Sequence, residues 1–433
     1  MEHQKFHYKT MEDIHTEEKK LGISLPFSED YKKLYEPLSL YGKVFANRLA
    51  IAPMEGNDSD ERGFPTESTS ERYLSYARGG AGVIWSEAVA VTPEGRSGKA
   101  QLMLNEETLS RFAEMNAQIK QAGRKANGYE PLLIMQANHS GRYAKPDGFY
   151  KPLIAYHHPV YENDHPLEDN CLVSDDYLDQ LIEIFDHSVG LCKSAGFDAV
   201  DIKCCHGYLL AELASAYTRP GKYGGSFENR FRFLLECVRR ALRYQDETFH
   251  VTLRLGIYDG FAYPYGWGVK EKGLNPDYSE ALKLVGILHR EMGIEMINIT
   301  MGNPYVNSHV TRPFDRGKYI PLEHPLEGVA RMYEGTRVIK NHYPKLKVMA
   351  SAPSYLRQFS PDLAAGAVAM GYCDLVSFGR QAFADPGFPN EIRKTGKLDK
   401  SHTCVTCGGC GELVRAGKPC GCVVRKPDRF SIR

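Results

Sequence analysis

The chain has 433 residues, and its 54 Lys and Arg residues balance 54 Asp and Glu residues, so its formal net charge is zero. This balance indicates neither nucleic-acid binding nor binding to an anionic membrane surface, and it favours a small-molecule substrate. No apolar run reaches the roughly 20 residues of a membrane helix, and the first residues lack the apolar region of a signal peptide. We therefore expect a cytoplasmic protein.

Apolar strand-like segments alternate with helix-like segments after a polar N-terminal arm at residues 1–36, which contains one expected helix at 11–21. The expected strands cover residues 49–54, 82–89, 132–137, 199–203, 251–257, 296–300, 347–350 and 375–379. The expected helices cover residues 70–78, 107–126, 175–194, 231–244, 278–292, 326–342 and 362–370. Eight alternating units in about 350 residues predict an α/β fold, a closed (β/α)8 TIM barrel, because no early G-x-G-x-x-G turn indicates an open sheet.

One strand end carries an unusual set of polar side chains. In the expected strand at 199–203, Asp201 and Lys203 share one face, and a Lys there is unfavourable unless it faces a polar site. The chain then turns at Gly207 and places His206 and Tyr208 within a few residues of this Lys. Because active sites of such barrels lie on the loops after the strands, this stretch is the candidate active site. A solvated loop with incidental polar groups is the alternative.

Several short motifs occur in the order in which a known family has them. They are Ala52-Pro53-Met54, Gln136 with His139-Ser140-Gly141-Arg142, His206-Gly207-Tyr208-Leu209, Tyr223-Gly224-Gly225-Ser226 with Glu228-Asn229-Arg230, and Gly379-Arg380. Together they resemble the old yellow enzyme family of NADH:flavin oxidoreductases, and most closely its branch of 2,4-dienoyl-CoA reductase and trimethylamine dehydrogenase. The resemblance implies an FMN-binding barrel, which we place at residues 37–395.

The resemblance also implies which residues bind FMN. They are Pro53, Met54, Glu55, Ala88, Gln136, Arg254, Gly379 and Arg380. Glu55 departs from the family, which has a small residue near the reactive edge of the flavin, and an ionised carboxylate there would make the flavin harder to reduce unless it points away. The segment 351–354, Ser-Ala-Pro-Ser, replaces the usual glycine-rich turn at the phosphate end.

Three residues match the catalytic positions of the family. Tyr208 corresponds to the Tyr that protonates the substrate α-carbon, and His206 to a donor that binds the substrate carbonyl. Lys203 replaces the other donor, which is commonly His. Its ammonium group has three donors and no acceptor, so it would polarise a carbonyl strongly or favour an anionic substrate group. In the alternative, Lys203 pairs with Asp201 and has only a structural role.

The C-terminal segment at residues 396–433 is rich in cysteine. Cys404, Cys407 and Cys410 recur at intervals of three, and Cys420 and Cys422 follow. The family pattern implies that Cys404, Cys407, Cys410 and Cys422 hold a 4Fe-4S cluster. A structural zinc ribbon is the alternative, although Cys420 and Cys422 are closer together than its usual pairs.

The expected activity is FMN-dependent reduction of an activated carbon–carbon double bond, with the hydride from flavin N5 and the proton from Tyr208. No Rossmann glycine fingerprint is present, so either NAD(P)H or a separate electron-donor protein would reduce the flavin. Two alternatives stay open. One is a dehydrogenase or demethylase that oxidises a small substrate and passes electrons to a partner, and the other is a barrel that keeps the cofactors without the chemistry.

Overall fold

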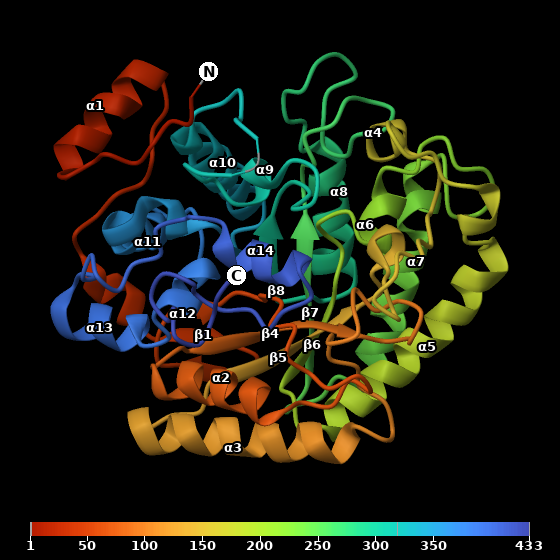
Figure 1. Cartoon of the computed structure of the whole chain (residues 1–433), viewed down its shortest axis with the longest axis horizontal. Coiled ribbons are helices and arrows are strands. Elements are labelled where there is room, and N and C mark those ends of the chain that lie inside the picture. Colours follow the sequence, from red (N-terminus) through yellow and green to blue (C-terminus); the bar gives the residue numbers. More distant parts are fainter. Residues whose placement is uncertain (1, 318, 433) are drawn as a thin grey trace.

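The computed structural model describes residues 2–317 and 319–432, and it contains a closed barrel of parallel strands (Figure 1). Around the barrel the strands follow the chain from β3 to β10, and β10 pairs with β3. They are β3 (Leu49–Ile51), β4 (Val83–Ala90), β5 (Leu132–Asn138), β6 (Ala199–Ile202), β7 (His250–Gly256), β8 (Met296–Thr300), β9 (Lys347–Ala350) and β10 (Leu375–Phe378). The predicted barrel is therefore confirmed, and each strand lies within a few residues of its expected position.

The strands have mostly apolar sequences, because each strand of the barrel is covered on both faces. Every residue of β4 and β5 is buried. Their register aligns three of the candidate residues: Ala88 on β4 lies opposite Gln136 on β5, and Gln136 lies opposite Asp201 on β6. This alignment places several functional residues at similar heights near the carboxyl ends of neighbouring strands.

The helices that follow the strands form the outer layer. They are α2 (Glu67–Arg78), α3 (Leu109–Asn127), α5 (Asp175–Ser194), α7 (Phe227–Ala241), α8 (Ser279–Gly286), α10 (Pro325–His342) and α11 (Ser360–Ala369). In Figure 1, α2 and α3 lie below the strands, α5 and α7 to their right, and α10 and α11 to their upper left. Helix α7 begins four residues earlier than expected, because the Ser226 hydroxyl caps it by accepting from the backbone N–H of Asn229.

A short hairpin that the sequence did not predict closes the amino end of the barrel. It consists of β1 (Leu38–Leu40) and β2 (Lys43–Phe45). Its buried side chains join a second core with Trp85 and Ile134 from the barrel strands. In its turn, Tyr41 stacks on His250 with 4.0 Å between ring centroids. Three-residue strands are too short to show an alternating pattern, so no sequence signal marked them.

Both terminal segments pack against the barrel. The arm carries α1 (Met11–Leu21), as predicted, and its Tyr31 hydroxyl donates to Asp362 of α11 at 2.7 Å. The C-terminal segment carries α14 (Gly409–Arg415) and lies over the loop after β3, where the backbone N–H of Cys420 donates to the Gly56 carbonyl at 2.7 Å. The boundaries 1–36, 37–395 and 396–433 stay predictions.

Several short elements lie in the loops. The helices are α4 (Pro159–Glu162), α6 (Leu209–Ala214), α9 (Ser308–Thr311), α12 (Arg380–Ala384) and α13 (Phe388–Thr395), and the one π-helical turn of the described chain, Ile287–Glu291, follows α8. The 3-10 turns are Tyr31–Tyr35, Gly141–Tyr143, Asp169–Cys171, Leu242–Tyr244 and Pro353–Phe359. Among the described residues, no helix is long and apolar enough to cross a lipid bilayer.

Candidate functional site: a cavity at the carboxyl ends of the strands

The carboxyl ends of the strands surround a solvent-connected cavity with about 1130 Å³ of empty space. Its wall contains all eleven residues that the sequence assigned to the cofactor and to catalysis: Pro53, Met54, Glu55, Ala88, Gln136, Lys203, His206, Tyr208, Arg254, Gly379 and Arg380. It also contains residues that the sequence did not single out, namely Pro304, Thr311, Arg312, Val414 and Arg415.

A tight left-handed turn after β6 brings the catalytic candidates into this cavity. His206 and Gly207 have φ angles of 67° and 70°, and Tyr208 then begins α6. A Cβ atom at Gly207 would lie 2.3 Å from the Asn303 side chain, so only glycine fits there. A non-glycine residue with positive φ is uncommon, and such strained positions cluster at functional sites.

Tyr208 is hydrogen-bonded to a second phenol. Its hydroxyl shares a hydrogen bond of 2.6 Å with the hydroxyl of Tyr305, a residue that is 46% exposed. Tyr143 stacks on Tyr305 with 3.8 Å between ring centroids and fixes its position. Burial raises the pKa of Tyr208 well above its usual value. Tyr208 therefore keeps its proton at neutral pH until a stronger base takes it.

His206 is a neutral imidazole. Its Nε2 atom lies 3.1 Å from the Thr300 hydroxyl at the end of β8. Burial lowers the pKa of His206 well below its usual value, and the charges of Arg254, Lys203 and Arg312 lower it further. A neutral imidazole has one N–H donor, so it can donate a hydrogen bond to a ligand without carrying charge.

Asp201 is occupied by other donors and does not pair with Lys203. Its carboxylate accepts from the indole N–H of Trp85 at 2.8 Å, from the amide of Gln136 at 2.7 Å and from the backbone N–H of Arg254 at 2.7 Å. Among the described residues, no ion pair joins Lys203 and Asp201, so the structural pairing considered above is wrong. Asp201 instead orients the Gln136 amide at the cavity wall.

The Lys203 ammonium group faces the cavity. It lies 3.7 Å from the centroid of the Tyr208 ring and is 5% exposed. Burial lowers the pKa of Lys203 to about 8, and the neighbouring Arg254 charge also lowers it. The ring contact stabilises the cation without using its three N–H donors, so these donors are available to a ligand.

Arg254 presents an unpaired guanidinium group to the same cavity. In the described parts of the chain, its side chain has no hydrogen-bond or ion-pair partner, and its Nε atom is buried. Burial lowers the pKa of Arg254, but the group stays charged. A buried guanidinium group without a hydrogen-bond or ion-pair partner is unfavourable alone, which indicates a ligand acceptor at this wall.

Glu55 lies in the cavity wall. Within the described chain its Oε1 atom is buried without a hydrogen-bond partner. Burial and the nearby Glu87 carboxylate raise the pKa of Glu55 to about 8. Glu87 pairs with Arg72 at 2.6 Å and accepts from the Gly56 backbone N–H at 2.7 Å. At neutral pH Glu55 is therefore a neutral acid, which removes the expected conflict with flavin reduction.

We expect Glu55→Gln to stabilise the protein above neutral pH. Between its unfolded pKa near 4.5 and its folded pKa of about 8, the folded chain binds more protons than the unfolded chain, so the free energy of unfolding falls as pH rises through this window. Gln mimics the protonated acid and does not titrate. The variant should gain about 1–3 kcal/mol at pH 8 relative to pH 5, measured by denaturant unfolding.

Glu61→Gln provides the control, because the Glu61 side chain is 82% exposed. This variant should show no gain between pH 5 and pH 8. An equal pH response in wild type and Glu55→Gln would mean that Glu55 is ionised in the folded protein.

The segment at the phosphate end keeps its turn without glycine. Ala352 adopts a left-handed conformation with φ 65°, and Ser354 follows it in the cavity wall. On the adjacent strand end, a Cβ at Gly379 would lie 2.8 Å from the sulfur of Met54. Arg380 uses one of its nitrogens to donate to the Pro313 carbonyl at 2.9 Å. A residue with a side chain at position 379 would therefore be too close to Met54.

The cysteine-rich segment borders the cavity through Cys410 and Cys420. The sulfurs of Cys404 and Cys422 each accept a backbone N–H at 3.4 Å, whereas Cys420 donates its S–H to the Cys410 carbonyl at 3.2 Å. In the described chain, no three cysteine sulfurs lie within 4.8 Å of one another. A single tetrahedral zinc would hold its sulfurs about 3.8 Å apart, so this arrangement is wider than a zinc site.

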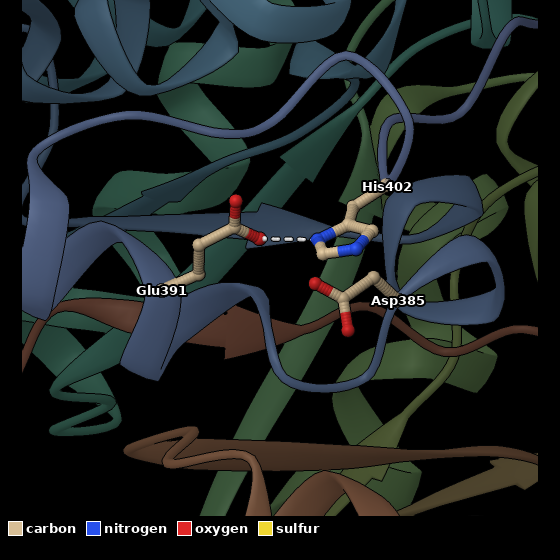
Figure 2. Close-up of side chains that lie close together, drawn as sticks. All are labelled: Asp385, Glu391 and His402. Atoms are coloured by element: carbon tan, nitrogen blue, oxygen red, sulfur yellow. Dashed lines mark hydrogen bonds and ion pairs between the residues drawn. The ribbon is translucent and has the colours of Figure 1, made fainter.

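A separate group of polar side chains fastens this segment to the barrel. Figure 2 shows Asp385, Glu391 and His402, of which Glu391 and His402 form an ion pair of 3.2 Å. His402 is exposed, and its carbonyl accepts from Gln381 of α12 at 3.2 Å. We interpret the group as an anchor for the start of the cysteine-rich segment.

The sequence model of the NADH:flavin oxidoreductase / NADH oxidase family matches residues 33–266, just over half of the chain. An NADH oxidase from Thermoanaerobacter brockii is 27% identical over 378 residues, which cover 85% of this chain and 52% of that protein. A cinnamate reductase from Clostridium sporogenes is 26% identical over 397 residues, covering 88% and 56%. The structure of a 2-naphthoyl-CoA reductase in complex with 2-naphthoyl-CoA superimposes with a TM-score of 0.74 at 21% identity, covering 91% and 57%.

The chain belongs to the NADH:flavin oxidoreductase / NADH oxidase family, as its motifs indicated, and this is a family of flavin-dependent oxidoreductases. FMN is the cofactor that this membership assigns to the barrel. The chain spans about half the length of the three relatives described above.

Proposed function

We propose that this protein reduces an activated carbon–carbon double bond of a small organic substrate in the cavity. The observation that carries the proposal is the position of Tyr208, which lies in the cavity wall with the donors His206 and Lys203 and whose hydroxyl is hydrogen-bonded to that of Tyr305. The clostridial relative is named a cinnamate reductase, which supports reduction as the direction.

The residues of the cavity fit FMN. The unpaired guanidinium of Arg254 would meet the pyrimidine edge of the flavin, with the Gln136 amide beside it. Arg380, the backbone at Gly379 and the Ser354 hydroxyl would hold the phosphate. Glu55 is neutral and places no negative charge against the ring. When bound and reduced, FMN supplies a hydride.

The side chains of this protein perform the remaining steps. Lys203 and His206 donate hydrogen bonds to the substrate carbonyl oxygen and stabilise the negative charge that develops there. Tyr208 donates its proton to the α-carbon, which balances the hydride received at the β-carbon. Tyr305 then returns a proton from solvent to Tyr208 through the 2.6 Å hydrogen bond.

Cys404, Cys407, Cys410 and Cys422 are proposed as the ligands of a 4Fe-4S cluster. Because Cys410 lies in the cavity wall, a cluster on these ligands would adjoin the cofactor site. This position supports electron entry through the cluster from a separate donor protein, and NAD(P)H is the other proposed donor.

Anaerobic half-reactions test the direction of the chemistry. The holoenzyme is reduced photochemically and mixed with enones and enoates, and its flavin absorbance is followed. Reoxidation at the turnover rate with formation of the saturated product supports the proposal. Rapid reduction of the oxidised enzyme by amines, without any reaction with alkenes, would replace it with the dehydrogenase alternative.

A further inference from the structure

The cavity carries a strong excess of positive charge. Five basic side chains line it, namely Lys203, Arg254, Arg312, Arg380 and Arg415, against the single acid Glu55. A single carboxyl group, whatever its protonation state, leaves most of these positive charges without an acid in the wall. A bound FMN accounts for Arg254 and Arg380 in the assignment above, so the remaining basic residues need another explanation.

Of these three basic residues, Arg415 alone forms an ion pair within the described chain. Arg415 forms an ion pair with Glu412 on α14. Within residues 2–317 and 319–432, neither Lys203 nor Arg312 has an ion pair or a side-chain hydrogen bond. Charged groups in a wall of restricted solvent access are stable when a ligand of opposite charge completes them.

Arg312 follows α9 in the loop after β8, the loop that also carries Tyr305. It converges on α14 of the cysteine-rich segment at Gly411, where a Cβ would lie 3.2 Å from Arg312 Nη2 and 3.6 Å from Arg415 Nη1. The missing side chain at Gly411 therefore leaves space in front of two guanidinium groups that both line the cavity.

Lys203 and Arg312 both border the carbonyl donor. Each lies close enough to His206 for its charge to act on the imidazole, Lys203 from the end of β6 and Arg312 from the loop after β8. A substrate oxygen that binds His206 is therefore within the field of both cations.

We infer that Lys203 and Arg312 form an anion subsite that binds the carboxylate of an α,β-unsaturated acid beside His206. This inference rests on the proposed function and names its substrate class. An ionised carboxylate withdraws electrons from a conjugated double bond only weakly, because it is already negative. Two cations neutralise this charge and make the β-carbon accept a hydride, so the group that identifies the substrate would also activate it.

A ligand titration of the oxidised holoenzyme tests the subsite without turnover. The probes are 3-phenylpropanoate and the neutral 3-phenylpropanamide, and binding is followed by the change in the flavin spectrum. The wild type should bind the carboxylate at least about tenfold more tightly than the amide, and Arg312→Met should abolish this preference. Affinity for the amide should change less than about threefold.

Two variants control for folding and for overall charge. Arg312→Lys keeps the charge and should restore part of the preference. Arg316→Met removes a positive charge from an exposed residue of the same loop and should bind both probes as the wild type does. Flavin content of each variant shows whether it is folded.

Unchanged carboxylate preference in a flavin-loaded Arg312→Met variant would overturn the inference, and so would equal binding of acid and amide by the wild type. A dependence on Arg312 for inorganic phosphate and not for the carboxylate would also overturn it. Because no turnover is needed, an enzyme that binds carboxylates through Arg312 but fails to reduce enoates would contradict the proposed function and not the subsite.

Discussion

Replacing Tyr208 with Phe is expected to lower the rate of alkene reduction by about 10²–10⁴-fold while flavin reduction stays near the wild-type rate. The change removes one hydroxyl group and keeps the ring, so the contact of the ring with the Lys203 ammonium, 3.7 Å from the centroid, is retained. Only the proton donor is lost. Rapid-mixing measurements of the two half-reactions separate these effects.

Tyr305→Phe is the matched control for this prediction. It removes the hydroxyl that shares the 2.6 Å hydrogen bond with Tyr208 but leaves the proton donor in place. We expect a smaller decrease, of about threefold to tenfold, because water would have to return the proton to Tyr208. Equal loss of both half-reactions in Tyr208→Phe would show a structural role for the phenol and would contradict its role as acid.

The barrel was predictable because a parallel strand buried on both faces is mostly apolar, as β4 and β5 are, and such segments alternate with helix-like ones along the chain. Helix starts were harder to place. Residues 223–230 were identified as a family motif, and no separate pattern indicated that Ser226 caps α7 within it. The hairpin of β1 and β2 was missed because its side chains become buried only when the closed barrel supplies a partner surface.

The family resemblance indicated the site residues, and they lie together because parallel strands in a barrel present their carboxyl ends to one cavity. Arg312 and Val414 were not predicted as site residues. Arg312 reaches the cavity from a long loop and Val414 from the C-terminal segment, and no local sequence pattern encodes how these two segments pack. The protonation of Glu55 depends on its burial and on Glu87, which is 32 residues away along the chain and adjacent only in the fold. Charge states of this kind follow from tertiary structure alone.

Cys422→Ser is expected to remove the proposed cluster, whereas Cys420→Ser should retain it. The Cys422 sulfur accepts the backbone N–H of Arg425, as the Cys404 sulfur accepts that of Thr406, and such N–H donors stabilise a thiolate ligand. Cys420 instead donates its S–H to the Cys410 carbonyl and is a protonated, buried thiol. Iron and labile sulfide analysis of anaerobically purified protein measures the difference.

The wild type and Cys420→Ser should contain about four iron and four sulfide per chain, and Cys422→Ser should contain less than about one of each. Zinc without sulfide in the wild type would contradict the cluster itself. Loss of iron in Cys420→Ser but not in Cys422→Ser would make Cys420, and not Cys422, the fourth ligand. Flavin content should be unchanged in Cys422→Ser, because this residue does not line the cavity, whereas Cys410 does. A Cys422→Ser variant that keeps its flavin but lacks the cluster then tests whether electrons reach the barrel through the cluster. If they do, a donor protein should no longer reduce the flavin, whereas photoreduced flavin should still react with the alkene.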